Sequence, residues 1–114
     1  MANKETLLQT TSTWNNKNFQ ELQLKNPEVT VLKITINVGE QLSMHKHDLV
    51  NIAYVKNGTL TVITDTNDSI TVHEGECLPE LIGEYHYGKN TGEKPVELVV
   101  FYIGEKGTPL AVNK

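Results

Sequence analysis

The chain contains no arginine. All ten of its basic residues are lysines, against fourteen acidic residues, which gives a net charge of −4 over 114 residues. Without a guanidinium group, the protein lacks the planar fork that binds carboxylate or phosphate through two parallel hydrogen bonds. The acidic balance and the missing basic stripe argue against nucleic acid and anionic membranes as partners. An anionic ligand must therefore rely on lysine, on backbone amides or on a metal ion.

Cysteine and long apolar runs are also scarce. Cys77 is the only cysteine, which excludes an intrachain disulfide and a cysteine cluster for zinc or iron–sulfur. The longest apolar run, residues 98–103, is far too short to cross a bilayer, and the N-terminus lacks the apolar core of a signal peptide. The cytoplasm is therefore the default location that we expect, and the mature form of an exported, periplasmic protein is the alternative.

Alternation of apolar and polar residues is the dominant pattern, and no window carries a helical stripe. From Leu32 to Val38 every second residue is apolar, as in a half-buried strand. Asn57-Gly58, between two apolar runs, predicts a hairpin. We therefore expect a single all-β barrel or sandwich of about nine short strands. The predicted strands cover an N-terminal arm at 5–14 and the segments 28–38, 49–55, 59–64, 69–73, 77–82, 85–87, 96–103 and 109–112.

Two histidines one residue apart, His45 and His47, form the first candidate site. On an extended strand such residues point to the same face, so both imidazoles reach one point above the sheet. Neutral imidazole is the commonest protein ligand of borderline divalent cations, but two ligands alone make a poor site. A third ligand must come from elsewhere, and His86 lies between two glycines on a later strand.

The glycines around the histidine pair have a regular spacing. Five residues separate Gly39 from His45-x-His47, three more precede Asn51, and six separate Asn51 from Gly58. This stretch resembles the first motif of the small single-domain cupins, in which the position of Asn51 is usually a glutamate. The second half of the chain resembles the second cupin motif at Gly75, Gly83, His86 and Asn90.

The resemblance extends over residues 29–104, with Leu81 in place of the proline of the second motif. It implies the cupin fold, a double-stranded β-helix or jelly-roll barrel, with His86 as the third metal ligand. The expected organisation is an N-terminal arm and edge strand at 1–27 and the cupin barrel at 28–114. Because cupins carry out many unrelated reactions on one barrel, the resemblance does not select the reaction.

Asn51 departs from the cupin pattern because an amide is a weaker, uncharged ligand. It either binds the metal directly or holds a water on it as an outer group. Glu80 interrupts an apolar run and stands six residues before His86, a position that faces the cavity in the proteins this chain resembles. Glu80 then supplies the missing charge, as a general acid/base or as an outer anchor. Otherwise it is a solvent-facing strand glutamate.

These residues predict one divalent transition metal, iron, nickel, manganese, copper or zinc, in a mostly apolar cavity. The resemblance implies a metal-dependent enzyme of the oxygenase, isomerase or lyase type, acting on a small oxygen-rich organic molecule. A non-catalytic binding or sensing protein for a sugar or organic acid is the alternative, and a purely structural metal is the third. Small cupins often pair through an N-terminal strand, so we also expect a homodimer. The predicted cavity lining comprises Leu42, Met44, Asn51, Ala53, Leu78 and Glu80.

Other conspicuous residues receive structural interpretations. His73, beside a turn, is expected to be solvated and without a role, and Cys77 to be a small buried side chain. Trp14 leads into a polar loop. The four tyrosines divide between the core and the rim, and alternation alone does not say which of them line the cavity.

Overall fold

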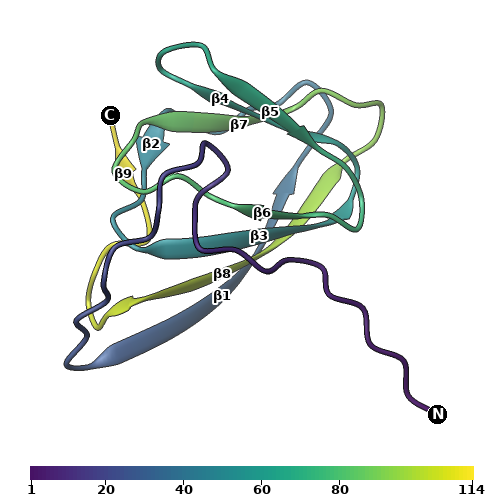
Figure 1. Ribbon diagram of the computed structural model, residues 1–114. Helices are drawn as coiled ribbons and strands as arrows, with labels where there is room; N and C mark the ends of the chain where they lie inside the picture. Colours follow the sequence, from purple (N-terminus) through teal and green to yellow (C-terminus); the bar gives the residue numbers. More distant parts are fainter.

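The computed structural model describes residues 1–114 and contains strands, turns and loops (Figure 1). None of its segments is a helix long and apolar enough to cross a membrane. The nine strands are β1 (Pro27–Ile36), β2 (His45–Lys46), β3 (Val50–Asn57), β4 (Leu60–Thr64), β5 (Ser69–Val72), β6 (Cys77–Pro79), β7 (His86–Asn90), β8 (Val96–Glu105) and β9 (Val112–Asn113).

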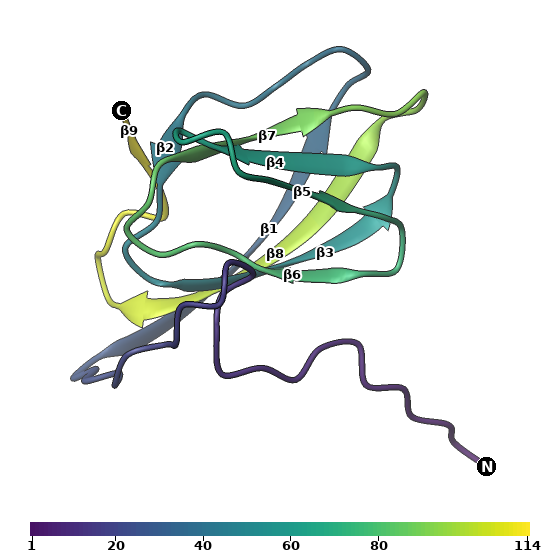
Figure 2. The same cartoon turned by 45° about the horizontal axis from the view of Figure 1, so that its top comes forward.

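The strands form two antiparallel sheets that face each other across the interior (Figure 2). One sheet has the order β1-β8-β3-β6 and the other the order β5-β4-β7-β2-β9. Strands that follow each other in sequence often lie in different sheets, as expected of a jelly roll. The all-β prediction is confirmed, and the chain folds as a jelly-roll β-barrel.

Alternation along the strands places one set of side chains between the two sheets. In β8 the residues at 96, 98, 100 and 102 are buried, while those between them are half-buried or exposed. Ile34 of β1 lies opposite Leu98 of β8, so apolar residues from neighbouring strands meet on the inner face. Each fully buried aliphatic side chain stabilises the fold by about 1.5–3 kcal/mol. Packing in this core fixes the positions of the two sheets, and the polar residues described below project from these sheets.

The hairpin predicted at Asn57-Gly58 is wrong. The turn exists, with Gly58 at a φ of 85°, but β3 before it pairs with β6 and β8, whereas β4 after it pairs with β5 and β7. The register of β3 against β8 shifts between Val55 and Asn57, and the chain crosses from one sheet to the other. A Cβ at Gly58 would lie 2.7 Å from the carbonyl oxygen of Pro95, so glycine is required by space as well as by φ.

The N-terminal arm also differs from the prediction. Residues 1–26 contain no strand within the single chain, and Ser12 and Asn18 form only an isolated bridge. Residues 1–10 extend away from the barrel (Figures 1 and 2). β6 ends at Pro79, earlier than predicted. The loop at 80–85 then turns inward and leads into β7, which begins at His86.

Candidate metal centre

Three histidines converge between the two sheets. His45 on β2 lies directly opposite His86 on β7, and His47 follows two residues after His45. The three ring centroids are 4.8, 4.8 and 5.0 Å apart, which makes a nearly equilateral triangle. One ring nitrogen from each histidine lies within 4.8 Å of the other two. The structure thus brings together the three residues that sequence spacing predicted as ligands.

Backbone carbonyls fix the tautomer of all three rings. His45 Nδ1 lies 2.5 Å from the carbonyl oxygen of Ser43, His47 Nδ1 lies 2.7 Å from that of Leu110, and His86 Nδ1 lies 2.9 Å from that of Glu84. A carbonyl oxygen only accepts hydrogen bonds, so each Nδ1 carries the proton and donates. In the neutral ring each Nε2 then presents a lone pair, the form in which imidazole binds a metal.

Burial favours the neutral, metal-binding form of two of these rings. It lowers the pKa of His45 and His47, and the neighbouring histidines lower the pKa of both further. The Nδ1 hydrogen bonds and the carboxylate of Glu80 act in the opposite direction, but the net shift is downward. These two imidazoles are consequently uncharged at neutral pH and can bind a cation.

An unpartnered atom indicates what the triangle holds. His86 is 1% exposed, and its Nε2 has no hydrogen-bond partner. A buried polar atom is normally paired, because leaving it unpaired costs about 1–3 kcal/mol. Three unprotonated imidazole nitrogens with backbone-fixed rings form a donor set that suits a divalent transition ion. The residues present therefore fit the predicted metal.

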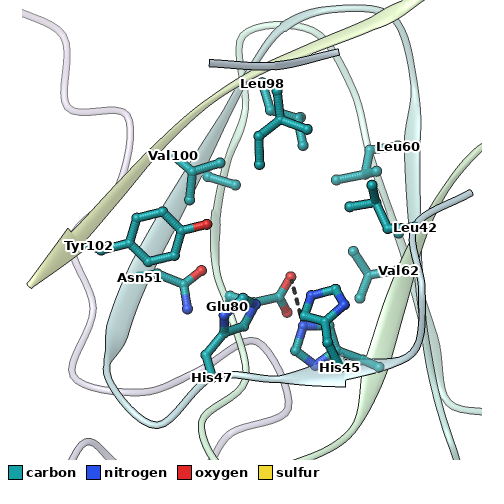
Figure 3. A pocket seen from close by; sticks show the side chains of 14 residues that line it. Leu42, His45, His47, Asn51, Leu60, Val62, Glu80, Leu98, Val100 and Tyr102 are labelled. Carbon is teal, nitrogen blue, oxygen red and sulfur yellow. Dashed lines mark ion pairs between the residues drawn. The ribbon is translucent and has the colours of Figure 1, made fainter. Parts of the chain in front are cut away.

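A cavity of about 50 Å³ lies above the histidines. It has room for an ion and a few waters, since about 10–15 Å³ of such space holds one water. Its polar lining is Asn51, Glu80 and Tyr102 besides the histidines (Figure 3). The rest is glycine and apolar side chains: Ile34, Leu42, Ala53, Leu60, Val62, Gly88, Leu98 and Val100.

Two residues predicted to line the cavity lie elsewhere, whereas Leu42 and Ala53 do line it. Leu78, opposite Ala53 in the β3–β6 pair, is 1% exposed and packs in the hydrophobic core, where it fills interior space. Met44 is half-buried and is not among the lining residues, because successive side chains of an extended segment point to opposite faces and His45 points inward.

Glu80 points into the barrel, which rules out the solvent-facing alternative. It is 8% exposed, and its Oε2 lies 3.6 Å from His86 Nε2 (Figure 3). Its Oε1 accepts hydrogen bonds from the indole N–H of Trp14 at 2.9 Å and from the backbone N–H of Leu81 at 3.0 Å. The structure places a fixed carboxylate beside the histidine triangle.

Asn51 and Tyr102 complete the polar wall. Asn51 is 3% exposed, and its amide nitrogen has no hydrogen-bond partner. The side chain thus presents a buried amide without a hydrogen-bond partner to the cavity, which suits either of the two roles predicted for Asn51. Burial raises the pKa of Tyr102, and the charge of Glu80 raises it further. Tyr102 therefore remains a neutral hydroxyl facing the cavity.

Sequence reasoning missed the roles of Trp14 and Tyr102. The partner of Trp14 lies 66 residues away, and the polar residues that follow Trp14 indicated only a loop. The inward orientation of Tyr102 could have been predicted, because Leu98, Val100 and Tyr102 are alternate residues of β8 and lie on the same inner face. Asn90, the last residue of the second motif, has a structural role and donates to the carbonyl oxygens of Ile36 and Lys94.

Comparison with known proteins agrees with this geometry. The family profile described as a cupin domain matches residues 32–102, more than half of the chain. The chain belongs to the cupin family. None of the curated proteins matches it. This cupin is structurally similar to a protein of Bacillus halodurans, with a TM-score of 0.63 and 22% identity over 75% of this chain and 68% of that one.

Two further solved structures illustrate the range of similar proteins. A cupin-like protein of Thermotoga maritima has a TM-score of 0.66 and 12% identity, over 75% of this cupin and 64% of that chain. An oxalate oxidase in complex with the substrate analogue glycolate has a TM-score of 0.57 and 26% identity, over 65% of this cupin and 41% of that chain. The match thus spans less than half of the oxidase.

A wider hollow of about 310 Å³ adjoins the histidines of this cupin on the side of the C-terminal segment. His45, His47 and Tyr102 line both spaces, so the hollow lies directly beside the small cavity. Its volume is at the lower end of the range for small-molecule sites. No charged side chain lines it; the other lining residues are Leu32, Ile34, Leu42, Ser43, Leu110, Ala111 and Asn113.

The histidine pKa shifts predict how the stability of the metal-free protein depends on pH. Because His45 and His47 have lowered pKa values in the folded state, the unfolded chain binds more protons at mildly acidic pH. The free energy of unfolding should therefore fall as the pH drops from about 7.5 to about 5.5, through the unfolded histidine pKa of about 6.5.

Urea unfolding of the metal-free protein at several pH values measures this dependence. The double variant His45→Asn/His47→Asn should show a shallower decline than the parent, whereas His73→Asn, which changes an exposed histidine, should show the parent's slope. Equal slopes in the parent and the double variant would contradict the expectation.

Proposed function

We propose that this cupin is a metal-dependent enzyme, of the oxygenase, isomerase or lyase type, acting on a small organic molecule whose oxygen atoms lie at one end. One observation carries the proposal: three imidazole nitrogens and a buried carboxylate share a small cavity that lies beside a ligand-sized hollow. A divalent transition ion bound there supplies Lewis-acid or redox chemistry.

The lining of the hollow supports the choice of ligand. It offers apolar contacts from Leu32, Ile34 and Leu110 and contains no charged side chain. An uncharged, largely apolar body therefore fits the hollow, while an enol, enolate or carboxylate group reaches toward the histidines. With no arginine in the chain, an anionic group has no bidentate partner among the side chains.

Two residues of the inner cavity suit the handling of the oxygen-bearing end. The unpartnered amide N–H of Asn51 can donate a hydrogen bond to a bound oxygen and hold it in place. The Oε2 of Glu80, which faces His86, is placed to act either as a general base and acid toward the bound molecule or as an anionic partner of the ion. The apolar residues around them exclude bulk water and strengthen both interactions.

Proteins of similar fold support an enzymatic role without selecting a reaction. They include the oxalate oxidase, the DMSP lyase DddQ of Ruegeria pomeroyi and the polyketide cyclase RemF of Streptomyces resistomycificus. The latter two are 16% and 18% identical to this chain, and at this identity the similarity concerns only the fold. The choice among oxygenase, isomerase and lyase chemistry is therefore left to a substrate screen.

An anion titration separates an open catalytic centre from a closed structural one. Cobalt(II)-loaded protein should change its visible absorption when azide or acetate is added, because the cavity leaves room beside the ion. If the spectrum stays constant at saturating anion, the metal is structural and the proposal fails. If enols and carboxylates bind but none is converted in a screen under air, the protein is the non-catalytic binding protein instead.

We also propose that the protein is a homodimer that pairs through the outer face of β1 and β8. Val29, Val31 and Phe101 are 54%, 59% and 41% exposed there, and Val31 lies opposite Phe101. Outer faces of barrel strands are usually polar, so this apolar face is unusual. In a two-fold dimer each copy would cover the apolar face of the other with the same face of its own. The exposed arm, including Leu7, extends freely and is available to the partner.

Light scattering should then give a mass of twice 12.8 kDa for the parent. The variant Val31→Lys should be monomeric with unchanged circular dichroism, and Thr35→Lys, on the same face of the same strand but outside the apolar area, should stay dimeric. A parent mass of 12.8 kDa would contradict the proposal.

A further inference from the structure

Glu80 and His86 face each other inside the barrel without a hydrogen bond between them. The Oε2 of Glu80 lies 3.6 Å from the Nε2 of His86, which is too long for a hydrogen bond. The Nδ1 of His86 donates to the carbonyl oxygen of Glu84, so in the neutral ring Nε2 carries a lone pair. Two electron-rich atoms therefore point at each other in a buried site, where charge is weakly screened.

A cation bound by both atoms resolves this conflict. The carboxylate also supplies the negative charge that three neutral imidazoles do not, which offsets the burial of a divalent ion. Asn51 cannot supply this charge, because its amide side chain is neutral. Asn51 and Glu80 are nevertheless neighbours, since the backbone N–H of Glu80 donates to the carbonyl oxygen of Asn51 at 3.0 Å.

The orientation of the Glu80 carboxylate is fixed from outside the barrel. Trp14 donates its indole N–H to Oε1, and its own backbone N–H donates to the carbonyl oxygen of Pro79 at 3.0 Å, which anchors the residue. With Leu81 as second donor, Oε1 is fully engaged and Oε2 is left toward the histidines. These two hydrogen bonds give a structural role to the single tryptophan of an otherwise polar segment.

The same N-terminal segment holds the other end of the loop. Asn15 Nδ2 and Lys17 Nζ each donate to the Glu84 carboxylate at 2.8 Å. The backbone carbonyl of Glu84 in turn accepts the Nδ1 proton of His86. Residues 13–17 thus brace the loop that carries Glu80 and leads to His86.

We propose that Glu80 is a fourth protein donor to the metal ion held by the three histidines, and that Trp14 is the residue that positions it. The inference rests on the proposed metal site, and a carboxylate from the loop after β6 then takes the place of the glutamate that the first motif lacks. The N-terminal segment, which lies outside the matched family region, is then part of the metal centre.

Cobalt(II) binding by four proteins tests both parts, with affinity measured against a chromophoric chelator and geometry by visible absorption. Glu80→Gln removes the charge and keeps the shape, and it should weaken binding more than about 10-fold and alter the spectrum. Trp14→Phe keeps a ring but removes the N–H donor; it should weaken binding about 10-fold and shift the same bands. Glu93→Gln, on an exposed loop, is the matched control and should behave like the parent.

The outcomes separate the two proposals. If the parent binds no cobalt(II), the metal site itself is wrong and this inference falls with it. If the parent binds tightly and Glu80→Gln binds with the same affinity and spectrum, the histidine site stands and Glu80 is not a donor. If Glu80→Gln is impaired and Trp14→Phe keeps the parent's spectrum and affinity, Trp14 has no positioning role. Circular dichroism of each variant confirms that the barrel is folded.

Discussion

Replacing His86 by alanine should reduce the affinity for a divalent transition ion by more than about 100-fold, beyond the range found when only an outer hydrogen-bond partner of a ligand is removed. His86 is the most buried of the three histidines, and its unpartnered Nε2 is the atom that the ion would engage. The remaining pair, His45 and His47, supplies two nitrogens, which is too few for a stable site.

Isothermal titration with nickel(II) measures the loss. The control is His73→Ala, which removes an exposed histidine from the turn after β5 and should leave the affinity unchanged. Similar affinities for the parent and His86→Ala, with both proteins folded, would show that nickel(II) binds elsewhere on the surface. A loss in both variants would indicate that the effect does not come from the triangle.

Truncating Leu78 should lower the free energy of unfolding by about 2–5 kcal/mol, the range for leucine-to-alanine changes in a packed core. Leu78 is 1% exposed and lies on β6 opposite Ala53. Leu42→Ala should cost clearly less, because Leu42 is only partly buried and borders open space, where its side chain makes fewer contacts. Urea unfolding of the metal-free proteins gives both values.

The comparison tests where the core ends and the cavity begins. Ile63→Ala, on a half-buried position of β4, provides a reference for a leucine-sized loss outside the core. If Leu42→Ala proves as destabilising as Leu78→Ala, the space around Leu42 is filled in solution, and the inner cavity and the hollow are smaller than described. Nickel(II) stoichiometry should be unchanged in both variants.

The histidine set could be predicted from sequence because its geometry is local and periodic. His45 and His47 share a face by strand parity, and His86 stands at a spacing typical of the family. Most strand positions could be predicted for the same reason, since apolar and polar residues alternate along each strand. Sequence placed Glu80 in the cavity as one of two alternatives, and burial decided between them.

The remaining errors concern pairings between distant segments. Asn57-Gly58 encodes a tight turn, but which sheet receives the next strand depends on β6, β7 and β8, all later in the chain. The contact between Trp14 and Glu80 is equally non-local. Leu78 shares the inner face with Ala53, and only the packing of the whole barrel decides which of the two borders the cavity. Local patterns carry no information on such choices.

Elemental analysis of protein purified without added metal and without a nickel column tests the central claim most directly. The account predicts about one iron, nickel, manganese, copper or zinc ion per chain in the parent, and none in the His45→Ala/His86→Ala variant of the same protein. Parent protein that is folded and carries no metal, and that takes up none when equilibrated with salts of these five metals, would contradict it.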